Sequence, residues 1–556
     1  MSSSDRVRYV LLIAFIPFLD NTIIPHITLK IYSSYLIYVI LDALIPREDF
    51  EIASDIGNGG NTRNKTTLSI EDLKYDSFFF AALRKPIFQR ETNEWDPKKI
   101  CAMIESFVDG ELIPAIILWR NQSGYIFVID GAHRLSSLGA WINDDYGDGI
   151  VSLKYYENYV SEEQRKIAEK TRKLVNEKIG SFREIMEICR NINISTDERK
   201  KKIAKNLGAL ALQLQWVEGN ADKAEDSFLK INQLATKISN AELELIQKRN
   251  YAYALAARAI VRAGKGYNYW SSFDEEIQKK IIDKSKEANI LMFGQGQYTA
   301  DDINNLPIGG AQISTFTLDV VTQTVKICNG ITKLDMAKEA SENEVLKCIE
   351  KTLKILQYIN SKEKFSLGLH PFIYFYSDIG KHKIGSYYGI LLFVKDLIEH
   401  KKINEFIDIR EKFEQIIYQY NFLVQQIIRK YRQSKRAYFY VKDYFAVIMK
   451  ILSAYPEYST EQVIEKLKQE DEFKFLQTEI VDNEEVSVKS NFSRGRKQQI
   501  KIRTFVSTLP KCPICGGYLD NKSISVDHIK RKADGGNNSI SNGQVTHLYC
   551  NTTYKN

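Results

Sequence analysis

The sequence is poor in cysteine and proline. Seven of its 556 residues are Cys and 11 are Pro. Three of the cysteines fall in one short C-terminal stretch, so a disulfide framework is not indicated and a reducing, cytoplasmic setting is favoured. The other four lie in apolar contexts and are expected in hydrophobic cores: Cys101, Cys189, Cys328 and Cys348.

Long apolar runs are also missing. Residues 9–19 and 31–45 are each shorter than the roughly 20 residues of a membrane-spanning helix, and Pro17, Asp20 and Asp42 interrupt them. No small-residue cleavage site follows the first run, so a signal peptide is not indicated. We expect two buried elements that pack on the body of the protein or on a partner chain. A membrane hairpin is the alternative.

Two further patterns are absent. The sequence contains no G-x-x-x-x-G-K-[ST], which excludes an ordinary phosphate-binding P-loop. It has no fixed-period repeat, so a solenoid is not supported. The Gly-rich stretch 294–310 lacks phosphate-loop spacing and is expected to be a surface loop.

At 556 residues the chain is too long for one hydrophobic core, and several units are expected. With 44% hydrophobic and 26% charged residues, it is typical of a folded protein rather than a disordered one. Helical periodicity dominates from about residue 160 to residue 480, as in 343–359 and 403–432. The aromatic segment 366–394 lies in this region and is expected to be helix core rather than a surface for stacking bases.

Basic residues are concentrated near the C-terminus. Eleven Lys or Arg but only three Asp lie between Val488 and Gly535, a local surplus of eight that is close to the net charge of +7 for the whole chain. A basic segment leading into a C-terminal domain suits contact with phosphates. A solvated linker is the plain alternative.

The most informative stretch runs from residue 512 to residue 551. Cys512 and Cys515 form a C-x-x-C knuckle, and His547 and Cys550 repeat the same spacing. Two such pairs suit a tetrahedral zinc ion, because each turn places two ligands near one point. A zinc ribbon that only binds would need no more than these four residues.

Further residues between and beside the pairs suit phosphodiester hydrolysis. A neutral imidazole at His528 can take a proton from water near pH 7. Asp527 and Asn551 offer hard oxygen atoms, which suit Mg²⁺ or Mn²⁺ better than zinc. A base and a cation beside the scissile phosphate are what this reaction needs.

Together these residues resemble the zinc-supported HNH nuclease family, whose pattern runs C-x-x-C, DH, GG, N and a final pair ending in C-N. The chain departs from many relatives in having His547 where they have Cys. The resemblance implies a ββα-metal fold with a structural zinc and a separate catalytic cation. It implies that Asp527 and Asn551 hold the catalytic cation, that His528 is the base and that Asn542 orients it.

The segment 96–141 predicts a helix, two strands, a tight turn and a second helix. Asp96 and Pro97 suit the start of a helix that runs to Phe107, and residues 113–119 and 125–130 are typical of strands. Gly131 then permits a sharp turn, and the following helix start can present N–H groups to an anion. In this turn Arg134 can grip a phosphate and Asp130 can hold a cation, with an Asp–Arg salt bridge as the plain alternative.

This region resembles the N-terminal domain of GmrSD-type and SspE-like restriction proteins, whose fold is related to ParB and sulfiredoxin. The resemblance rests on P-x-x-Q-R at 86–90, on D-G-A-H-R at 130–134 where the family has DGQQR, and on F-x-x-I-N at 228–232. It spans about 86–243, with a helical insertion, and implies that nucleoside triphosphate binding and hydrolysis gate the nuclease. The implied nucleotide-site residues are Gln89, Arg90, Asp130, His133 and Arg134, with Asn232 as a weaker candidate.

We therefore expect an α+β multidomain protein that is mainly α. Its parts are an apolar segment and loop at 1–66, a ParB/sulfiredoxin-like sensor domain at 67–245, a helical domain at 246–480, a basic linker at 481–505 and an HNH nuclease domain at 506–556. The expected activity is metal-dependent cleavage or nicking of DNA, with restriction of phage DNA as the role. An RNA-cleaving HNH toxin and a non-enzymatic ParB-like DNA-binding regulator are the alternatives. A homo-oligomer and a membrane contact by the N-terminus stay open.

Overall fold

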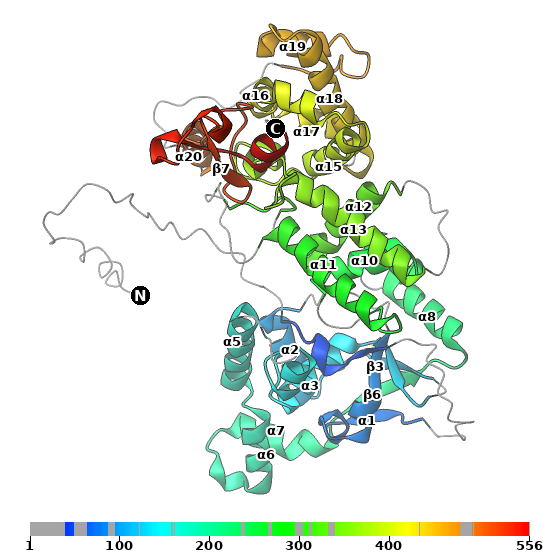
Figure 1. Ribbon diagram of the computed structural model, residues 1–556. Helices are drawn as coiled ribbons and strands as arrows, with labels where there is room; N and C mark the ends of the chain where they lie inside the picture. Colours follow the sequence, from blue (N-terminus) through cyan, green and yellow to red (C-terminus); the bar gives the residue numbers. More distant parts are fainter. Residues whose placement is uncertain are drawn as a thin grey trace, which may run out of the picture. The chain divides into compact units, whose positions relative to one another are not determined.

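The computed structural model of the protein is mainly helical, with one small mixed sheet and a C-terminal two-stranded unit (Figure 1). This agrees with the expected fold class. All residues described below belong to one contact unit, Leu36–Asn556. The structure describes residues 39–48, 64–86, 95–121, 123–156, 160, 162–234, 240–264, 269–294, 303, 305–310, 314–331, 340–432, 434–478, 492 and 494–554.

A mixed sheet organises the N-terminal region. Its strands lie in the order β1-β3-β5-β4-β6-β2. The pairs β1–β3, β3–β5 and β4–β6 are parallel, whereas β4–β5 and β2–β6 are antiparallel. The bounds are β1 (Arg47–Glu48), β2 (Thr67–Ser69), β3 (Leu83–Pro86), β4 (Ile116–Arg120), β5 (Ile126–Asp130) and β6 (Ala211–Trp216).

The helices that flank β4 and β5 begin where the sequence predicts. At α2 (Pro97–Val108), Asp96 caps the first turn by accepting the Lys99 N–H. At α3 (Ala132–Ile142), Gly131 turns the chain with φ 97°. The first predicted strand starts late, because Pro114 has no N–H to give to a ladder.

The other α-helices of this region are α1 (Phe78–Ala82), α4 (Ile150–Tyr155), α5 (Glu162–Lys178), α6 (Phe182–Arg190), α7 (Glu198–Asn206), α8 (Ala221–Leu234) and α9 (Asn240–Gln247). Its 3-10 turns are η1 (Asp42–Leu44), η2 (Glu71–Leu73), η3 (Ile192–Ile194) and η4 (Leu207–Ala209).

The end of the second apolar run is buried, as expected. Val39, Leu41 and Leu44 belong to the hydrophobic core beneath the sheet, and the Val39 N–H donates to the Trp95 carbonyl. Residues 1–38, which include the first run, and most of the predicted loop 55–66 lie outside the described residues. Among the described helices, none combines the length and the apolar character that crossing a membrane requires.

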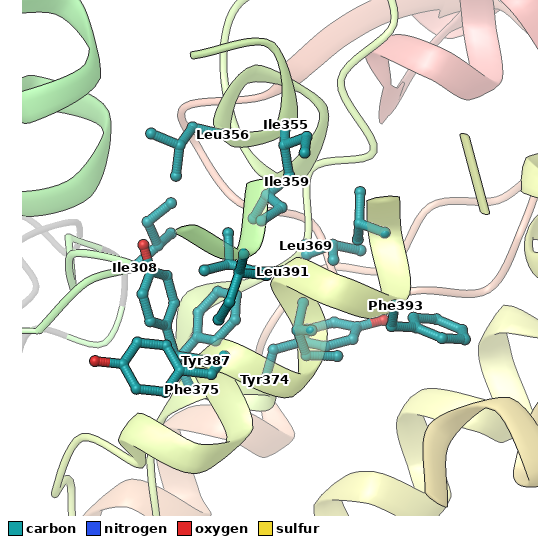
Figure 2. Packing of buried hydrophobic residues seen from close by; sticks show 14 of the residues in the cluster. Ile308, Ile355, Leu356, Ile359, Leu369, Tyr374, Phe375, Tyr387, Leu391 and Phe393 are labelled. Carbon is teal, nitrogen blue, oxygen red and sulfur yellow. The ribbon is translucent and has the colours of Figure 1, made fainter. Parts of the chain in front are cut away.

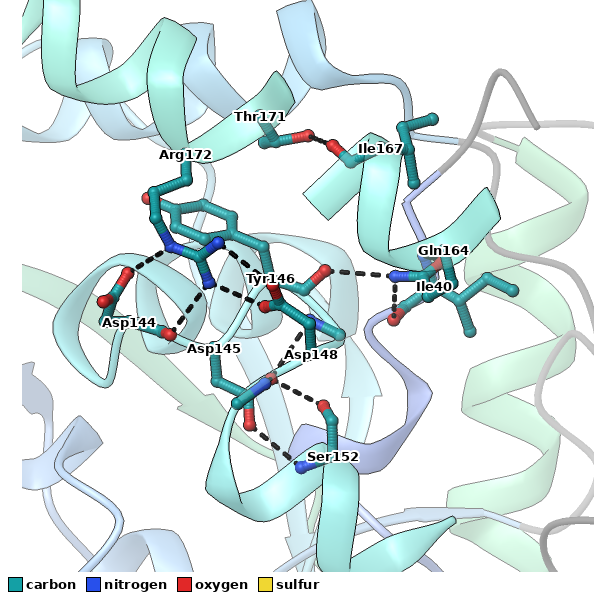
Figure 3. Close-up of polar contacts among 12 residues, drawn as sticks. Ile40, Asp144, Asp145, Tyr146, Asp148, Ser152, Gln164, Ile167, Thr171 and Arg172 are labelled. Carbon is teal, nitrogen blue, oxygen red and sulfur yellow. Dashed lines mark hydrogen bonds and ion pairs between the residues drawn. The ribbon is translucent and has the colours of Figure 1, made fainter. Parts of the chain in front are cut away.

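A buried carboxylate fixes the loop after α3 (Figure 3). Asp145 accepts hydrogen bonds from the N–H groups of Gly147, Gly149 and Ser152 and from the Ser152 hydroxyl. Gln164 of α5 then donates to the carbonyls of Tyr146 and Ile40. The chain before the sheet is thereby tied to the loop that follows α3.

The helical region has a continuous core, part of which Figure 2 shows. The aromatic segment 366–394 lies in it: Tyr374, Phe375 and Tyr387 are each at most 1% exposed. Its expected role as core is confirmed. The helices are α10 (Ala252–Val261), α11 (Glu275–Phe293), α12 (Ser314–Asn329), α13 (Glu342–Ile359), α14 (Pro371–Phe375), α15 (Ile384–Glu399), α16 (Ile403–Gln419), α17 (Leu423–Lys430), α18 (Ser434–Ala454) and α19 (Thr460–Leu467).

Two predictions about local burial are wrong. Most of the described part of the Gly-rich stretch is buried, including Leu306 and Ile308, and the Pro307 carbonyl accepts the Tyr376 hydroxyl. The helical periodicity of 403–432 is confirmed, with a break between α16, which ends at Gln419, and α17, which begins at Leu423. Cys189 is exposed, whereas Cys101, Cys328 and Cys348 are buried as expected, and all seven cysteines are free thiols.

The C-terminal part follows a helix. The second half of the predicted linker forms α20 (Arg494–Ser507), whose Ile502 and Val506 are buried in the helical core. This half is a docked helix, while residues 479–491 lie outside the described residues. After it come β7 (Ile524–His528), η5 (Lys532–Asp534), η6 (Ile540–Asn542), β8 (Gly543–His547) and the π-helical turn η7 (Cys550–Tyr554).

Candidate metal centre and nuclease site

Four buried side chains converge at the base of the C-terminal unit. The ligand atoms of Cys512, Cys515, His547 and Cys550 all lie within 4.8 Å of one another. His547 Nδ1 is 3.3 Å from Cys515 Sγ and 3.9 Å from Cys550 Sγ. Donor atoms on a zinc tetrahedron are about 3.6 Å apart, given bonds of about 2.0–2.3 Å. The four residues therefore fit a zinc ion.

Local backbone structure aims these ligands. In the knuckle, the Gly516 N–H donates to the Cys512 carbonyl, and Gly516 has φ 68°, which favours glycine. His547 ends β8, and its Nε2 lies 3.0 Å from the Tyr518 carbonyl. A carbonyl that takes the Nε2–H leaves Nδ1 to face the metal. The pKa of the Cys512 thiol is lowered, mainly because the Cys515 and Cys550 thiols donate hydrogen bonds to its sulfur and so stabilise the thiolate.

The strand β7 carries Asp527, a predicted ligand of the catalytic cation. Asp527 is 9% exposed and accepts a hydrogen bond from Gln544 Nε2, across the ladder in which Asp527 pairs with Gln544. Asn551 of η7 donates from Nδ2 to Ser525 Oγ, at 3.0 Å. Because Ser525 and Asp527 are two residues apart on one strand, their side chains share a face. The structure therefore brings Asp527 and Asn551 to the same face of β7.

His528 follows Asp527 at the end of β7. Its side chain begins on the alternate face, the one that also carries Val526, which is 74% exposed. The His528 Nε2 lies 3.0 Å from the amide oxygen of Asn538. That contact orients the imidazole, because an amide oxygen can only accept, so Nε2 carries the proton.

Asn542 braces the loop between the strands. Its Oδ1 accepts the Lys530 N–H at 2.8 Å, and its Nδ2 donates to the carbonyls of Lys530 and Asn537. Its orienting role, implied by resemblance, would therefore act through the backbone next to His528. Asn538, which touches the ring, was not predicted from the sequence, although it lies two residues after Gly535-Gly536, the GG of the family pattern.

The Gly pair has a clear steric reason. A Cβ on Gly536 would lie 1.9 Å from the Lys530 carbonyl oxygen, so only glycine fits. Gly535 has φ 83°, which also favours glycine. The loop that carries Asn538 back towards His528 thus depends on both residues. Exposed basic side chains border it, namely Lys530, Arg531 and Lys532.

At the predicted nucleotide site, the described side chains of Asp130, His133 and Arg134 contact other protein groups. Arg134 forms an ion pair with Asp130 and also donates to the Pro114 carbonyl. The His133 ring stacks on Trp95, with ring centroids 5.5 Å apart. In these contacts Arg134 has the salt-bridge arrangement that was the plain alternative. Gln89 and Arg90 lie outside the described residues, as does the side chain of Asn232.

Comparison with known proteins supports both resemblances. Residues 70–248 match the model of the GmrSD restriction endonuclease, N-terminal domain. Residues 512–556 match the model of the HNH endonuclease. No curated protein and no solved structure gives a significant match. The chain thus carries a restriction-type N-terminal domain and an HNH nuclease domain of the zinc-supported kind.

Proposed function

We propose that this protein is a metal-dependent DNA endonuclease whose HNH unit hydrolyses phosphodiester bonds. The observation that carries the proposal is the arrangement on β7, where Asp527 and Asn551 share a face and His528 is held by Asn538. The domain matches support a nuclease of restriction type. The restriction-type match of the N-terminal region supports DNA, rather than RNA, as the substrate.

In the proposed reaction His528 is the general base. Since Nε2–H donates to Asn538, the lone pair that takes the proton from water is on Nδ1. Mg²⁺ or Mn²⁺, when bound, stabilises the charge that develops on the phosphate and on the leaving oxygen. The carboxylate of Asp527 and the amide oxygen of Asn551 are the hard ligands that would hold this ion. Asn542 keeps the strand-to-strand loop in place while the proton moves.

The basic surface suits a polyanionic substrate. Lys530, Arg531 and Lys532 are exposed and follow His528 after one residue, Ile529. Helix α20 adds the exposed side chains of Lys497 and Arg503. Phosphate contacts of this kind contribute binding that is independent of sequence and weakens as salt rises.

The N-terminal domain is proposed to gate cutting in response to a nucleoside triphosphate or to foreign DNA, with phage restriction as the role. Asp130 and Arg134 are 38% and 12% exposed, so a ligand phosphate can compete for Arg134 without unfolding the domain. By resemblance, Gln89, Arg90 and His133 are the further candidates for this proposed site. Calorimetric titration with ATP, GTP and CTP tests this part alone, and a flat titration with all three removes it.

One assay tests the nuclease proposal. The purified protein is incubated with plasmid, modified and unmodified phage DNA, and total RNA, in Mg²⁺, Mn²⁺ or chelator, with and without nucleotide. We expect metal-dependent nicks or breaks in DNA. Cleavage of RNA alone would instead identify an RNase, and DNA binding without turnover in any metal would identify a regulator.

A further inference from the structure

The metal centre lies against a buried ion pair that comes from the helical region. Arg410 and Glu414 stand one turn apart on α16, and their side chains are 0% and 1% exposed. Arg410 Nε donates to Glu414 Oε1 at 2.6 Å. A fully buried pair is costly to desolvate and is tolerated only with good geometry and further hydrogen bonds. Its remaining partners therefore matter.

The guanidinium of Arg410 reaches the zinc ligands directly. Nη1 lies 3.4 Å from His547 Nδ1 and donates to the Leu367 carbonyl, and Nη2 donates to the Gly368 carbonyl. The cationic end of the pair thus faces the ligand cage.

Glu414 reaches the same cage by a second route. Its Oε1 accepts the Tyr374 hydroxyl, and its Oε2 accepts the Tyr518 N–H at 2.7 Å. The carbonyl of the same Tyr518 lies 3.0 Å from His547 Nε2. One residue of the C-terminal unit therefore bridges the ion pair and the zinc-ligand histidine.

The fit between the two parts is too close for added atoms. A Cβ on Gly517 would lie 2.4 Å from Arg410 Nε, and one on Gly516 would lie 2.6 Å from Glu411 Cβ. On the helical side, a Cβ on Gly368 would lie 2.9 Å from His547 Cδ2. The zinc knuckle and α16 are packed as one interior rather than as two touching surfaces.

We propose that Arg410 is a positioning residue of the zinc centre, so that metal binding and docking of the nuclease unit on α16 are one coupled event. A Zn²⁺ ion bound by three thiolates and a neutral imidazole would carry one net negative charge. The positive guanidinium of Arg410 would stabilise that charge at close range. Conversely, an empty cage of protonated thiols offers no net negative charge to the guanidinium of Arg410. The inference concerns metal binding and does not depend on the proposed reaction.

The first experiment measures zinc retention in the full-length protein by titration with a chelator of known affinity. For Arg410→Met we expect zinc affinity to fall by about 10- to 100-fold, the usual loss when a partner of a metal ligand is removed. Arg410→Lys keeps the positive charge but lacks the planar guanidinium, so we expect a smaller loss of zinc affinity. Refilling with Co²⁺ should shift the thiolate-to-cobalt absorption bands in Arg410→Met.

The matched control is Arg258→Met in α10. Arg258 is also buried, at 2% exposure, and donates to a backbone carbonyl, that of Leu245. We expect this variant to lower thermal stability while zinc affinity stays within about two-fold of the unsubstituted protein. Equal zinc retention in both methionine variants, or an equal loss in both, overturns the proposal.

A second measurement uses the protein without substitution, in case the variants fail to fold. Amide hydrogen exchange is compared before and after zinc removal. We expect faster exchange in α16, residues 403–419, and around Leu367–Gly368, with α2 and α3 unchanged as internal controls. Unchanged protection of α16 after complete zinc removal would contradict the coupling.

Discussion

Two ion pairs, each between residues four apart, show how differently the two candidate sites are built. Asp130 and Arg134 span a strand end and a helix start, and they are 38% and 12% exposed. Arg410 and Glu414 lie within one helix and are 0% and 1% exposed. An exposed pair can exchange a partner for a ligand at modest cost, whereas opening a buried pair leaves a charge without compensation. We therefore propose that the N-terminal pair opens to a ligand, whereas the buried pair holds the zinc centre in place.

The largest expected effect is the loss of cleavage at the C-terminal site while the zinc centre behind it stays intact. His528→Ala should lower the cleavage rate by about 10²- to 10⁴-fold, because the general base is lost. Zinc content and DNA binding should stay unchanged, since His528 belongs to neither cage nor core. His400→Ala, at an exposed histidine of the helical region, is the matched control. Full activity of His528→Ala in Mg²⁺ would reject the proposed mechanism.

The next largest effect comes from adding one methyl group at the two turns. Gly536→Ala places a Cβ against the Lys530 carbonyl, which cannot move aside, so the loop must shift and cleavage should fall by about 10²-fold. Gly131→Ala meets the side-chain end of Ile116 at 2.5 Å and a φ of 97°. It should cost about 1–3 kcal/mol of unfolding free energy. Thermal melts and cleavage assays on both variants check this. We expect Gly536→Ala to lose more cleavage activity than its change in stability explains, and Gly131→Ala to lose stability.

The two asparagines of the loop should differ in a smaller but informative way. Asn538→Ala removes the acceptor of His528 Nε2, and we expect about a 10-fold lower cleavage rate with normal stability. Asn542→Ala removes hydrogen bonds to Lys530 and Asn537, so it should also speed amide exchange of residues 529–543. Equal exchange in the two variants would show that Asn542 does not brace the loop.

The smallest effect tests the N-terminal pair. Asp130→Asn should change the unfolding free energy by about 0–1 kcal/mol, because the pair is partly solvated. Glu414→Ala, by contrast, should cost about 3–5 kcal/mol, since it strands a buried guanidinium. Chemical denaturation of both variants gives the two values. Similar losses would show that the two pairs are equivalent after all.

Local patterns in the sequence predicted much of this structure. The cap at Asp96, the turn at Gly131 and the four metal-ligand candidates each depend on residues close in the chain. Spacing rules are sufficient for such features, because the physical cause lies within a few residues.

What could not be predicted depends on contacts between distant segments. Arg410 is 137 residues from His547, and no pattern on an amphipathic helix marks one buried arginine as a neighbour of a zinc ligand. Likewise, the glycines around Leu306 and Ile308 predicted a surface loop, and no local pattern indicated that these two side chains are buried. Asn538 was missed because its role depends on how the loop folds back on β7 rather than on its spacing from His528.

The shared interior of the zinc knuckle and α16 has a consequence for recombination. The stretch that matches the HNH endonuclease begins at residue 512, but the side chains that pack behind its ligands belong to residues 410 and 414. A gene exchange that cut at the edge of the motif would deliver a nuclease unit lacking its supporting wall. Transplants that carry α16 with the motif should keep zinc and fold, so the heritable module is larger than the motif by which it is identified.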